Sequence, residues 1–378
     1  MKSSSFISIL CLTRFLPVLS AILVCTLALA AETTRVACVG NSLTDGTGLA
    51  GRDTACYPAR LQQLLGPTYQ VLNFGVAGAT MLKNGNEPYW TFGIAAFNSA
   101  MTFLPNSVVI ELGTNDSKST AANDNWPPNK DEFAGDYEAM VDTFANLSSH
   151  PEVWACYPPP AYSTASDIDS TVIHYEILPR IKTVVLAKGI SLIDLFATMS
   201  GKSNLFPDGI HPNAEGYLLI AQKVYRMFMK DTINITQRKN WLEAPQDGSL
   251  YQWYYQGGPI AAASGGAGEV FIAKDTGSYK VSVGQSTTTD DILVTKTVHV
   301  SLSDIGSWAA QPHVLPASLF SHSVQGSVFF YHPDGRMAAS LFLPEEVSPH
   351  FLARIAPLVP SGLYLVKADR RTFKLVIP

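Results

Sequence analysis

Short runs of apolar residues alternate with amphipathic stretches over the first half of the chain. Buried strands are predicted at residues 35–39, 69–74, 107–112, 152–156 and 191–195. Stretches with helical spacing of apolar residues lie at residues 58–65, 92–101, 131–147, 171–188 and 214–229. Strands that are apolar throughout and separated by helices are typical of a parallel sheet covered on both faces. The pattern predicts a three-layer α/β/α domain over residues 31–235.

The pattern changes after this domain. Residues 241–302 are rich in Gly, Ser, Thr, Tyr and β-branched residues, which indicates a small all-β module. A stretch with two prolines follows and predicts a linker at residues 303–322. Residues 323–378 return to strand-like runs and predict a second β module. The strands expected in the two modules are 251–255, 277–283, 292–300, 327–331, 337–343, 362–367 and 373–377. The last two are expected to form a hairpin.

The first thirty residues have the pattern of a secretory signal peptide. Lys2 lies near the start of the chain, and Arg14 directly precedes an apolar run that includes Ala28-Leu29-Ala30 near its end. A lipoprotein signal would use Cys25, but the bulky Val24 before it disfavours this alternative. Elsewhere in the sequence no apolar stretch reaches the length of a membrane span, so we expect an exported protein without a transmembrane anchor.

Composition excludes two classes of protein. Of the 378 residues, 47% are hydrophobic and 15% charged, which excludes a disordered chain. The formal net charge is −5 and there is no block of Lys and Arg, so nucleic acid is not an expected partner. Outside the signal, Cys38, Cys56 and Cys156 lack C-x-x-C spacing. One disulfide with Cys56 is conceivable, but we favour buried thiols, and we expect no zinc site.

Two segments predict nucleophilic catalysis. Ser42 follows the first strand in Gly40-Asn41-Ser42-Leu43, at the sheet edge where open α/β folds bind ligands. Asp208 and His211 lie three residues apart in a loop before the last helix of the domain. A serine hydroxyl needs a base to remove its proton, and a carboxylate orients that base. Ser42, His211 and Asp208 are therefore candidates for nucleophile, base and orienting acid.

Two further segments predict stabilisation of an oxyanion. Gly78 follows the second strand and can present a bare backbone N–H, while Asn115 follows the third and can present a side-chain amide. Gly75 is interpreted as a turn residue and Asp116 as a brace for its loop. Because all four segments follow or face strand ends, we expect them to meet at one edge of the sheet.

At this point the chain resembles the SGNH hydrolases, also called the GDSL esterase and lipase family. The resemblance covers residues 35–228 and implies a flavodoxin-like domain. It implies Ser42, His211 and Asp208 as the triad, with the N–H groups of Ser42 and Gly78 and the amide of Asn115 as oxyanion hole. It implies no metal and no cofactor. Asn41 departs from the Asp in the family name, which puts the local hydrogen bonding in doubt.

The loops of this domain favour a carbohydrate substrate. They carry aromatic and polar residues rather than a long apolar insertion, and resemble exported bacterial members of the family that deacetylate carbohydrates. Trp90 and Trp126 are candidates for binding sugar rings, the alternative being that they fill the cores of their own loops. His150 and His174 are expected at the surface. The predicted activity is removal of acetyl groups from plant polysaccharide, such as acetylxylan, or from sialic acid.

The appended modules also carry resemblances. Residues 250–254 and 277–281 resemble immunoglobulin-like modules, in which Trp253 would be a core residue. Residues 327–376 resemble the carboxyl-terminal sorting domain of type IX secretion substrates, which implies contact with secretion machinery and release or retention at the outer-membrane surface of a bacterium. Two alternatives stay open. One is a lipase, lysophospholipase or thioesterase of the same family, and the other is a non-catalytic, surface-displayed polysaccharide-binding protein.

Overall fold

The computed structural model describes residues 33–120, 123–230, 233–238, 240–245, 248–285 and 288–305, together with four strands between residues 326 and 377. The predicted signal peptide and most of the predicted linker lie outside the described residues, as does the connection at residues 333–336 between the strands expected at 327–331 and 337–343. Among the described residues, no helix is both long enough and apolar enough to span a membrane.

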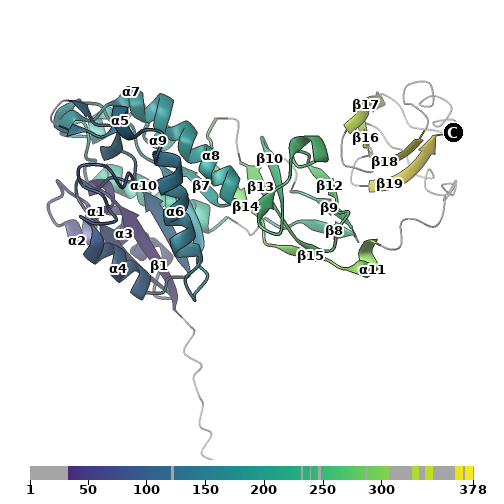
Figure 1. Ribbon diagram of the computed structural model, residues 1–378, viewed down its shortest axis with the longest axis horizontal. Coiled ribbons are helices and arrows are strands. Elements are labelled where there is room, and N and C mark those ends of the chain that lie inside the picture. The colour runs from purple at the N-terminus through teal and green to yellow at the C-terminus, as the bar shows by residue number, and fades with distance from the viewer. Residues whose placement is uncertain are drawn as a thin grey trace, which may run out of the picture. The chain divides into compact units, whose positions relative to one another are not determined.

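Five parallel strands form the sheet of the first domain (Figure 1). They are β1 (Thr34–Gly40), β2 (Tyr69–Gly75), β3 (Ser107–Glu111), β6 (Glu152–Tyr157) and β7 (Ser191–Asp194). Their spatial order is β2-β1-β3-β6-β7. This is the flavodoxin-like order, in which the chain reverses direction across the sheet between β1 and β3 and leaves a crevice at their carboxyl ends. All five predicted strands are confirmed.

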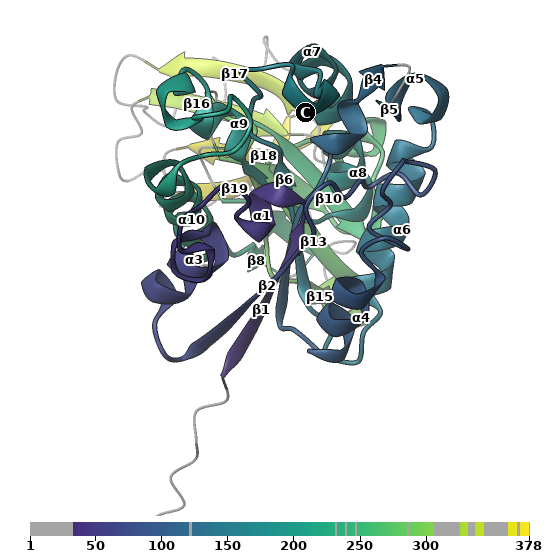
Figure 2. The ribbon, with the colours of Figure 1, turned by 90° about the vertical axis from the view of Figure 1, so that its left-hand side faces the viewer.

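Alternate residues of each central strand enter different cores because side chains of a strand point to opposite faces. Ala37 and Val39 of β1 belong to one core, and Val36 and Cys38 to the other. The first core is covered by α4 (Ile94–Thr102), α6 (Phe133–Ala145) and α8 (Leu178–Lys188), and the second by α3 (Tyr57–Leu65), α9 (Leu195–Met199) and α10 (Ala214–Phe228). Figure 2 shows the two groups of helices on either side of the sheet. The predicted three layers are confirmed.

Two predicted elements are divided in the structure. The helix expected at 171–188 consists of α7 (Ser170–Val172), a π-helical turn (Ile173–Ile177) and α8. Pro179 in the first turn of α8 lacks an N–H and cannot continue a regular ladder from the preceding turn. The strand expected at 292–300 is broken into β14 (Ile292–Val294) and β15 (Val298–Val300), which pair with different parts of one neighbouring strand.

The strands between residues 236 and 300 form two packed sheets. One holds β8 (Thr236–Arg238), β9 (Trp241–Glu243) and β12 (Val270–Ile272), and the other holds β10 (Tyr251–Tyr255), β11 (Gly258–Pro259), β13 (Gly277–Gly284), β14 and β15. Trp253 is fully buried between them, stacks on Phe271, and donates its indole N–H to the carbonyl of Gly268. The predicted core role of Trp253 is confirmed. A short helix, α11 (Leu302–Ile305), follows β15 and occupies the start of the predicted linker.

The two domains share one sheet. Ile292 of β14 pairs antiparallel with Leu192 of β7, so that β10, β11, β13, β14 and β15 extend the parallel sheet to ten strands. The sequence pattern predicts a separate module and gives no sign of this junction.

The last four strands pair only among themselves in the described part of the chain. They are β16 (Gly326–Tyr331), β17 (Met337–Leu343), β18 (Gly362–Ala368) and β19 (Arg371–Ile377), in the order β17-β16-β18-β19. The antiparallel pairing of β18 with β19 confirms the predicted terminal hairpin.

Candidate functional site

The predicted site residues meet at the carboxyl edge of the parallel sheet. Ser42 opens α1 (Ser42–Asp45), a single turn directly after β1. Gly78 follows β2, and Asn115 opens a short 3₁₀ turn after β3. The loop before α10 brings His211 over Ser42, although 169 positions separate them in the chain.

Ser42, His211 and Asp208 form a continuous hydrogen-bonded chain. The Oγ of Ser42 lies 2.9 Å from Nε2 of His211, and Nδ1 of His211 lies 2.7 Å from Oδ2 of Asp208. The carboxylate accepts a hydrogen bond from Nδ1–H of His211. Nε2 therefore carries no proton and is the acceptor that faces the serine hydroxyl. This arrangement can remove a proton from Ser42 and return it to a leaving group.

The loop itself fixes the carboxylate of Asp208. Its Oδ1 accepts the backbone N–H groups of Ile210, at 2.9 Å, and of His211, at 2.6 Å. Partial burial would raise the pKa of Asp208, but these bonds and the bond from the His211 ring together lower it below its usual value. Gly209 between them has φ of 81°, and a Cβ there would lie 2.3 Å from that of Ser163. Only glycine allows this turn.

The turn that carries the serine presents its backbone N–H to the site. Asn41 caps α1, its Oδ1 accepting the N–H of Leu43 at 2.8 Å. An aspartate would accept the same bond, so the departure at Asn41 leaves the turn intact and adds no charge beside the buried Glu111. Gly78 has φ of 85°, a conformation in which a bare N–H can face the crevice. Among the described residues neither the N–H of Ser42 nor that of Gly78 has an acceptor.

Asn115 is held in place by its neighbours. Its Nδ2 donates to the carbonyl of Ala79 at 3.1 Å, next to Gly78, and an amide has a second N–H to offer. The Nδ2 of Asn125 donates to the carbonyl of Asn115 at 2.9 Å. Asp116 accepts the N–H groups of residues 81 and 82, so its predicted bracing role is confirmed. Burial raises the pKa of Asp116 to about 6, despite these bonds.

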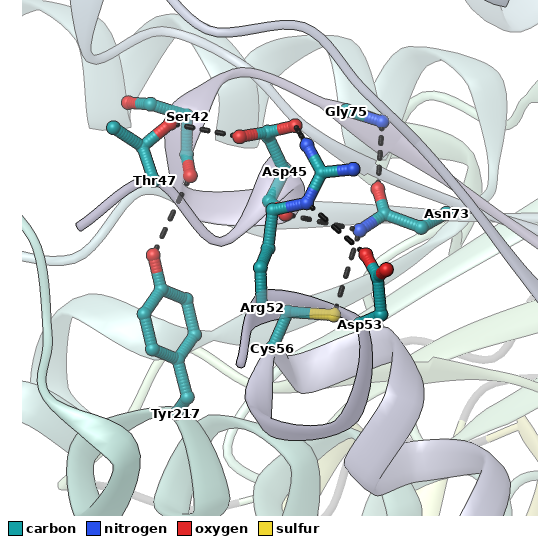
Figure 3. Close-up of polar contacts among 9 residues, drawn as sticks. All are labelled: Ser42, Asp45, Thr47, Arg52, Asp53, Cys56, Asn73, Gly75 and Tyr217. Carbon is teal, nitrogen blue, oxygen red and sulfur yellow. Dashed lines mark hydrogen bonds and ion pairs between the residues drawn. The ribbon is translucent and has the colours of Figure 1, made fainter. Parts of the chain in front are cut away.

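A second set of contacts secures α1 from behind (Figure 3). The hydroxyl of Tyr217, on α10, donates to the carbonyl of Ser42 at 3.4 Å. The carboxylate of Asp45 accepts from the Thr47 hydroxyl at 2.8 Å and pairs with Arg52 at 2.6 Å. The amide of Asn73 donates to the carbonyl of Asp45 at 3.2 Å. The nucleophile turn is thereby tied to β2 and α10.

Glu111, the last residue of β3, is a buried carboxyl beneath this turn. Its side chain is 1% exposed, and Oε2 lies 3.5 Å from the hydroxyl of Thr44. Burial raises the pKa of Glu111 well above its ordinary value, because the charged form loses its hydration in the interior. The sequence pattern assigns no role to Glu111. The signal that could have found it is a carboxyl group at the end of a strand that is otherwise mostly apolar.

The two tryptophans expected to bind sugar differ in exposure. Trp126 is 2% exposed, packs edge-on against Phe133 and lies under Arg180, so the proposal that it stacks on a sugar ring is wrong. Trp90 is half-buried and donates its indole N–H to the carbonyl of Met81 at 2.9 Å. Lys83 lies 4.4 Å from the centre of its ring. Both rings make packing or hydrogen-bond contacts within the loops that carry them.

The remaining candidates fall outside the site. Cys38, Cys56 and Cys156 are free thiols and all buried, as favoured from the sequence. Burial raises the pKa of Cys38 to about 12, so it is inert as a nucleophile. His150 and His174 are exposed, as predicted. Within the described residues no group of three or more His, Cys, Asp or Glu side chains is placed to hold a metal ion.

Residues 38–219 match the model of the GDSL-like Lipase/Acylhydrolase family. The match lies within the first domain and makes that domain similar to this family. Over 206 residues the chain is 38% identical to an acetylxylan esterase of Xylanibacter ruminicola. The aligned region spans 50% of this chain and 42% of the relative. The chain thus covers less than half of that relative's length.

Solved structures similar to the GDSL-like domain include two esterases. An aryl esterase of M. smegmatis has a TM-score of 0.42 at 19% identity, covering 52% of this chain and 98% of that one. Est24, a carbohydrate acetylesterase from Sinorhizobium meliloti, has a TM-score of 0.42 at 21% identity, covering 52% of this chain and 100% of its own.

Several residues that support the site in the GDSL-like domain were not singled out from the sequence. Tyr217 reads as one more apolar position of an amphipathic helix, and only its contact with Ser42 distinguishes it. Asn125 supports the loop of Asn115. Neither residue follows one of the strands predicted from the sequence, and position after a predicted strand was the signal that found Ser42, Gly78 and Asn115.

Proposed function

We propose that the protein is a serine esterase that removes acetyl groups from carbohydrate, with acetylated xylan as the favoured substrate. The observation that carries the proposal is the hydrogen-bonded chain from Ser42 through His211 to Asp208. The acetylxylan esterase relative supports the choice of substrate. The half-buried, polar loops around the crevice suit hydroxyl-bearing rings better than an acyl chain.

The mechanism follows from the roles of these groups. Ser42 Oγ attacks the ester carbonyl carbon while Nε2 of His211 takes its proton. The oxyanion is stabilised by the N–H groups of Ser42 and Gly78 and by the amide of Asn115. The carbon–oxygen bond to the sugar breaks as His211 protonates the departing hydroxyl. Water, deprotonated by His211, then attacks the acetyl-serine and releases acetate.

Ser42→Ala tests the proposal. Acetate release from acetylated xylan is expected to fall by about 10⁴-fold or more, because no other group takes the acetyl. Ser99→Ala removes an exposed hydroxyl that bonds only within α4 and is the matched control. Release at the parent rate by Ser42→Ala would refute the triad. Activity that rises from acetyl to octanoyl esters would instead favour a lipase or thioesterase.

We further propose that residues 1–30 direct export and that residues 323–378 act as a type IX sorting domain, with an immunoglobulin-like fold for residues 241–302. Support comes from the sequence pattern of the first segment and from the β-strands of the other two. Export predicts that a chain expressed in a type IX-competent bacterium appears outside the cells. Deletion of residues 323–378 is expected to leave it in the periplasm, and unchanged secretion would rule out the sorting role.

A further inference from the structure

A second cavity lies at the opposite edge of the sheet from Ser42. It has a volume of about 510 Å³ and is formed by the starts of β6 and β7, the end of α10 and the segment that follows β14. The catalytic groups follow the carboxyl ends of the strands, whereas Glu152 and Ser191 in this wall are the first residues of β6 and β7. The cavity is therefore separate from the esterase site. Its volume is in the range of small-molecule sites.

Cations gather around this cavity although the chain as a whole carries a net charge of −5. Four of its lining residues are lysines, contributed by different segments of both domains: Lys188, Lys230, Lys280 and Lys296. Only Lys188 is neutralised, by Asp142 at 2.8 Å and by Glu138 at 3.5 Å. In the described part of the chain none of the other three forms an ion pair.

Two of the three unpaired ammonium groups have only neutral partners. Lys280 donates to the carbonyl of Gly189 at 2.8 Å, and Lys230 donates to the side-chain oxygen of Gln285 at 3.2 Å. Burial lowers the pKa of both lysines, and for Lys230 it outweighs the opposing effect of the Asp291 carboxylate. An anion in the cavity would compensate the positive charge of these ammonium groups.

The wall also holds a hydrogen-bond donor without a partner. Trp154 of β6 is 8% exposed, and its indole N–H has no acceptor among the described residues. Buried donors of this kind are rare in folded proteins because each costs free energy. The ring of Trp154 packs against Phe228 with centroids 4.8 Å apart, and half-buried Phe228 and Ile233 add apolar surface to the same wall.

We propose that this cavity binds a carboxylate-bearing sugar, that is, a uronic acid unit of a polysaccharide. The unpaired lysines supply charge for the carboxylate, and the apolar wall of Trp154, Phe228 and Ile233 suits the C–H face of a sugar. A single inorganic anion would leave most of the cavity and its apolar wall unused. The site holds an acidic polymer to the enzyme at a distance from the crevice where acetyl groups are removed.

Binding of trigalacturonate to the full-length protein, measured by isothermal titration calorimetry, tests the proposal. The double variant Lys230→Glu/Lys296→Glu is expected to bind about tenfold more weakly or worse, because hydrogen bonds to charged groups are among the strongest. Lys274→Glu makes the same charge change at an exposed lysine outside the cavity and is expected to bind like the parent. Equal loss in both variants, or no binding by the parent, would overturn the proposal.

Two more measurements separate a sugar site from a site that binds any anion. Phe228→Ala removes apolar surface from the wall, and we expect it to weaken trigalacturonate binding several-fold without loss of the folded state, checked by thermal unfolding. Xylotriose, which is neutral, is expected not to bind. Displacement of trigalacturonate by an equal concentration of sulfate would contradict the proposal.

The test is independent of the esterase proposal. Hydrolysis of 4-nitrophenyl acetate depends on Ser42 and is expected to be equal in the parent and the lysine variants. Failure of trigalacturonate to bind would leave the esterase assignment untouched, and an inactive Ser42→Ala variant is expected to bind trigalacturonate as the parent does.

Discussion

At the scale of single residues, two carboxyl groups near Ser42 have pKa values shifted in opposite directions. Hydrogen bonds from its own loop lower the pKa of Asp208 and favour its charged form, whereas burial raises the pKa of Glu111, beneath α1, and favours its neutral form. The first favours an imidazolium at His211 during the reaction. The second lets a carboxyl lie under the nucleophile turn without a negative charge that would oppose the oxyanion.

Asn115→Ala tests the oxyanion hole. Loss of one donor is expected to lower kcat by about 10²- to 10³-fold with little change in KM, because the amide stabilises charge that exists only in the transition state. Steady-state kinetics on 4-nitrophenyl acetate would measure this. Asn146→Ala, which removes an exposed amide that bonds only to the backbone carbonyl of Asp142 at the end of α6, is the control. A change confined to KM would exclude Asn115 from the oxyanion hole.

Glu111→Gln tests the protonation of the buried carboxyl. In the unfolded chain the group loses its proton near its ordinary pKa of 4.5, whereas the folded chain retains it to higher pH. The folded state therefore binds more protons in this window, and its stability falls as pH rises, by at most about 1.4 kcal/mol per pH unit. Glutamine removes this dependence.

Urea denaturation of parent and Glu111→Gln at pH 5 and pH 8 measures the effect. We expect the stability of the variant, relative to the parent, to increase between the two pH values. A difference that stays constant would show that Glu111 is ionised in the folded protein.

At the scale of elements, the junction between β7 and β14 rests on a small set of buried polar contacts. Asp291 accepts the N–H of Asp194 at 2.9 Å and pairs with Lys223 of α10, and both side chains of this pair are largely buried. Asp290 donates its N–H to Asp194 at 2.9 Å and pairs with the more exposed Lys182 at 2.7 Å. The two residues that precede β14 thus contact the end of β7 and the helix α10, which follows the loop of His211.

Asp291→Ala is expected to destabilise the protein by about 3 to 5 kcal/mol, because it leaves the ammonium of Lys223 buried without a partner. Lys182→Ala removes a solvent-exposed pair at the same junction and is expected to cost about 1 kcal/mol or less. Urea unfolding of the two variants measures both values. Equal losses would mean that the buried pair does not hold the junction.

At the scale of the whole molecule, the two predicted β modules differ in their dependence on the catalytic domain. The sheet β17-β16-β18-β19 makes all its strand pairs internally among the described residues. By contrast β14 covers β7, which would otherwise be an unpaired edge strand prone to aggregation.

Two truncations test this difference. A chain ending at residue 305 is expected to keep its thermal midpoint and its hydrolysis of 4-nitrophenyl acetate. A chain ending at residue 230 exposes the edge of β7 and leaves Lys223 unpaired, so it is expected to aggregate or to unfold at least about 10 °C lower. Thermal unfolding and size-exclusion chromatography distinguish the outcomes. A stable, monomeric short chain would show that the catalytic domain folds alone.

The sequence by itself determined the order of strands and helices in the first domain and the residues that follow each strand. Apolar periodicity is local, and the carboxyl ends of parallel strands share one edge, so Ser42, Gly78 and Asn115 were placed together without coordinates. His211 and Asp208 were found for a related reason, because a carboxylate three residues from a histidine is a short-range pattern.

Only the tertiary structure decided what depends on distant parts of the chain. Trp126 is a core residue because Phe133 and Arg180 cover its ring, and the pKa of Glu111 is raised because neighbours from several elements exclude water from it. The pairing of β14 with β7 joins residues about a hundred positions apart, beyond the reach of any local pattern. Burial and long-range pairing are properties of the packed chain, and they turned two predicted domains into one continuous sheet.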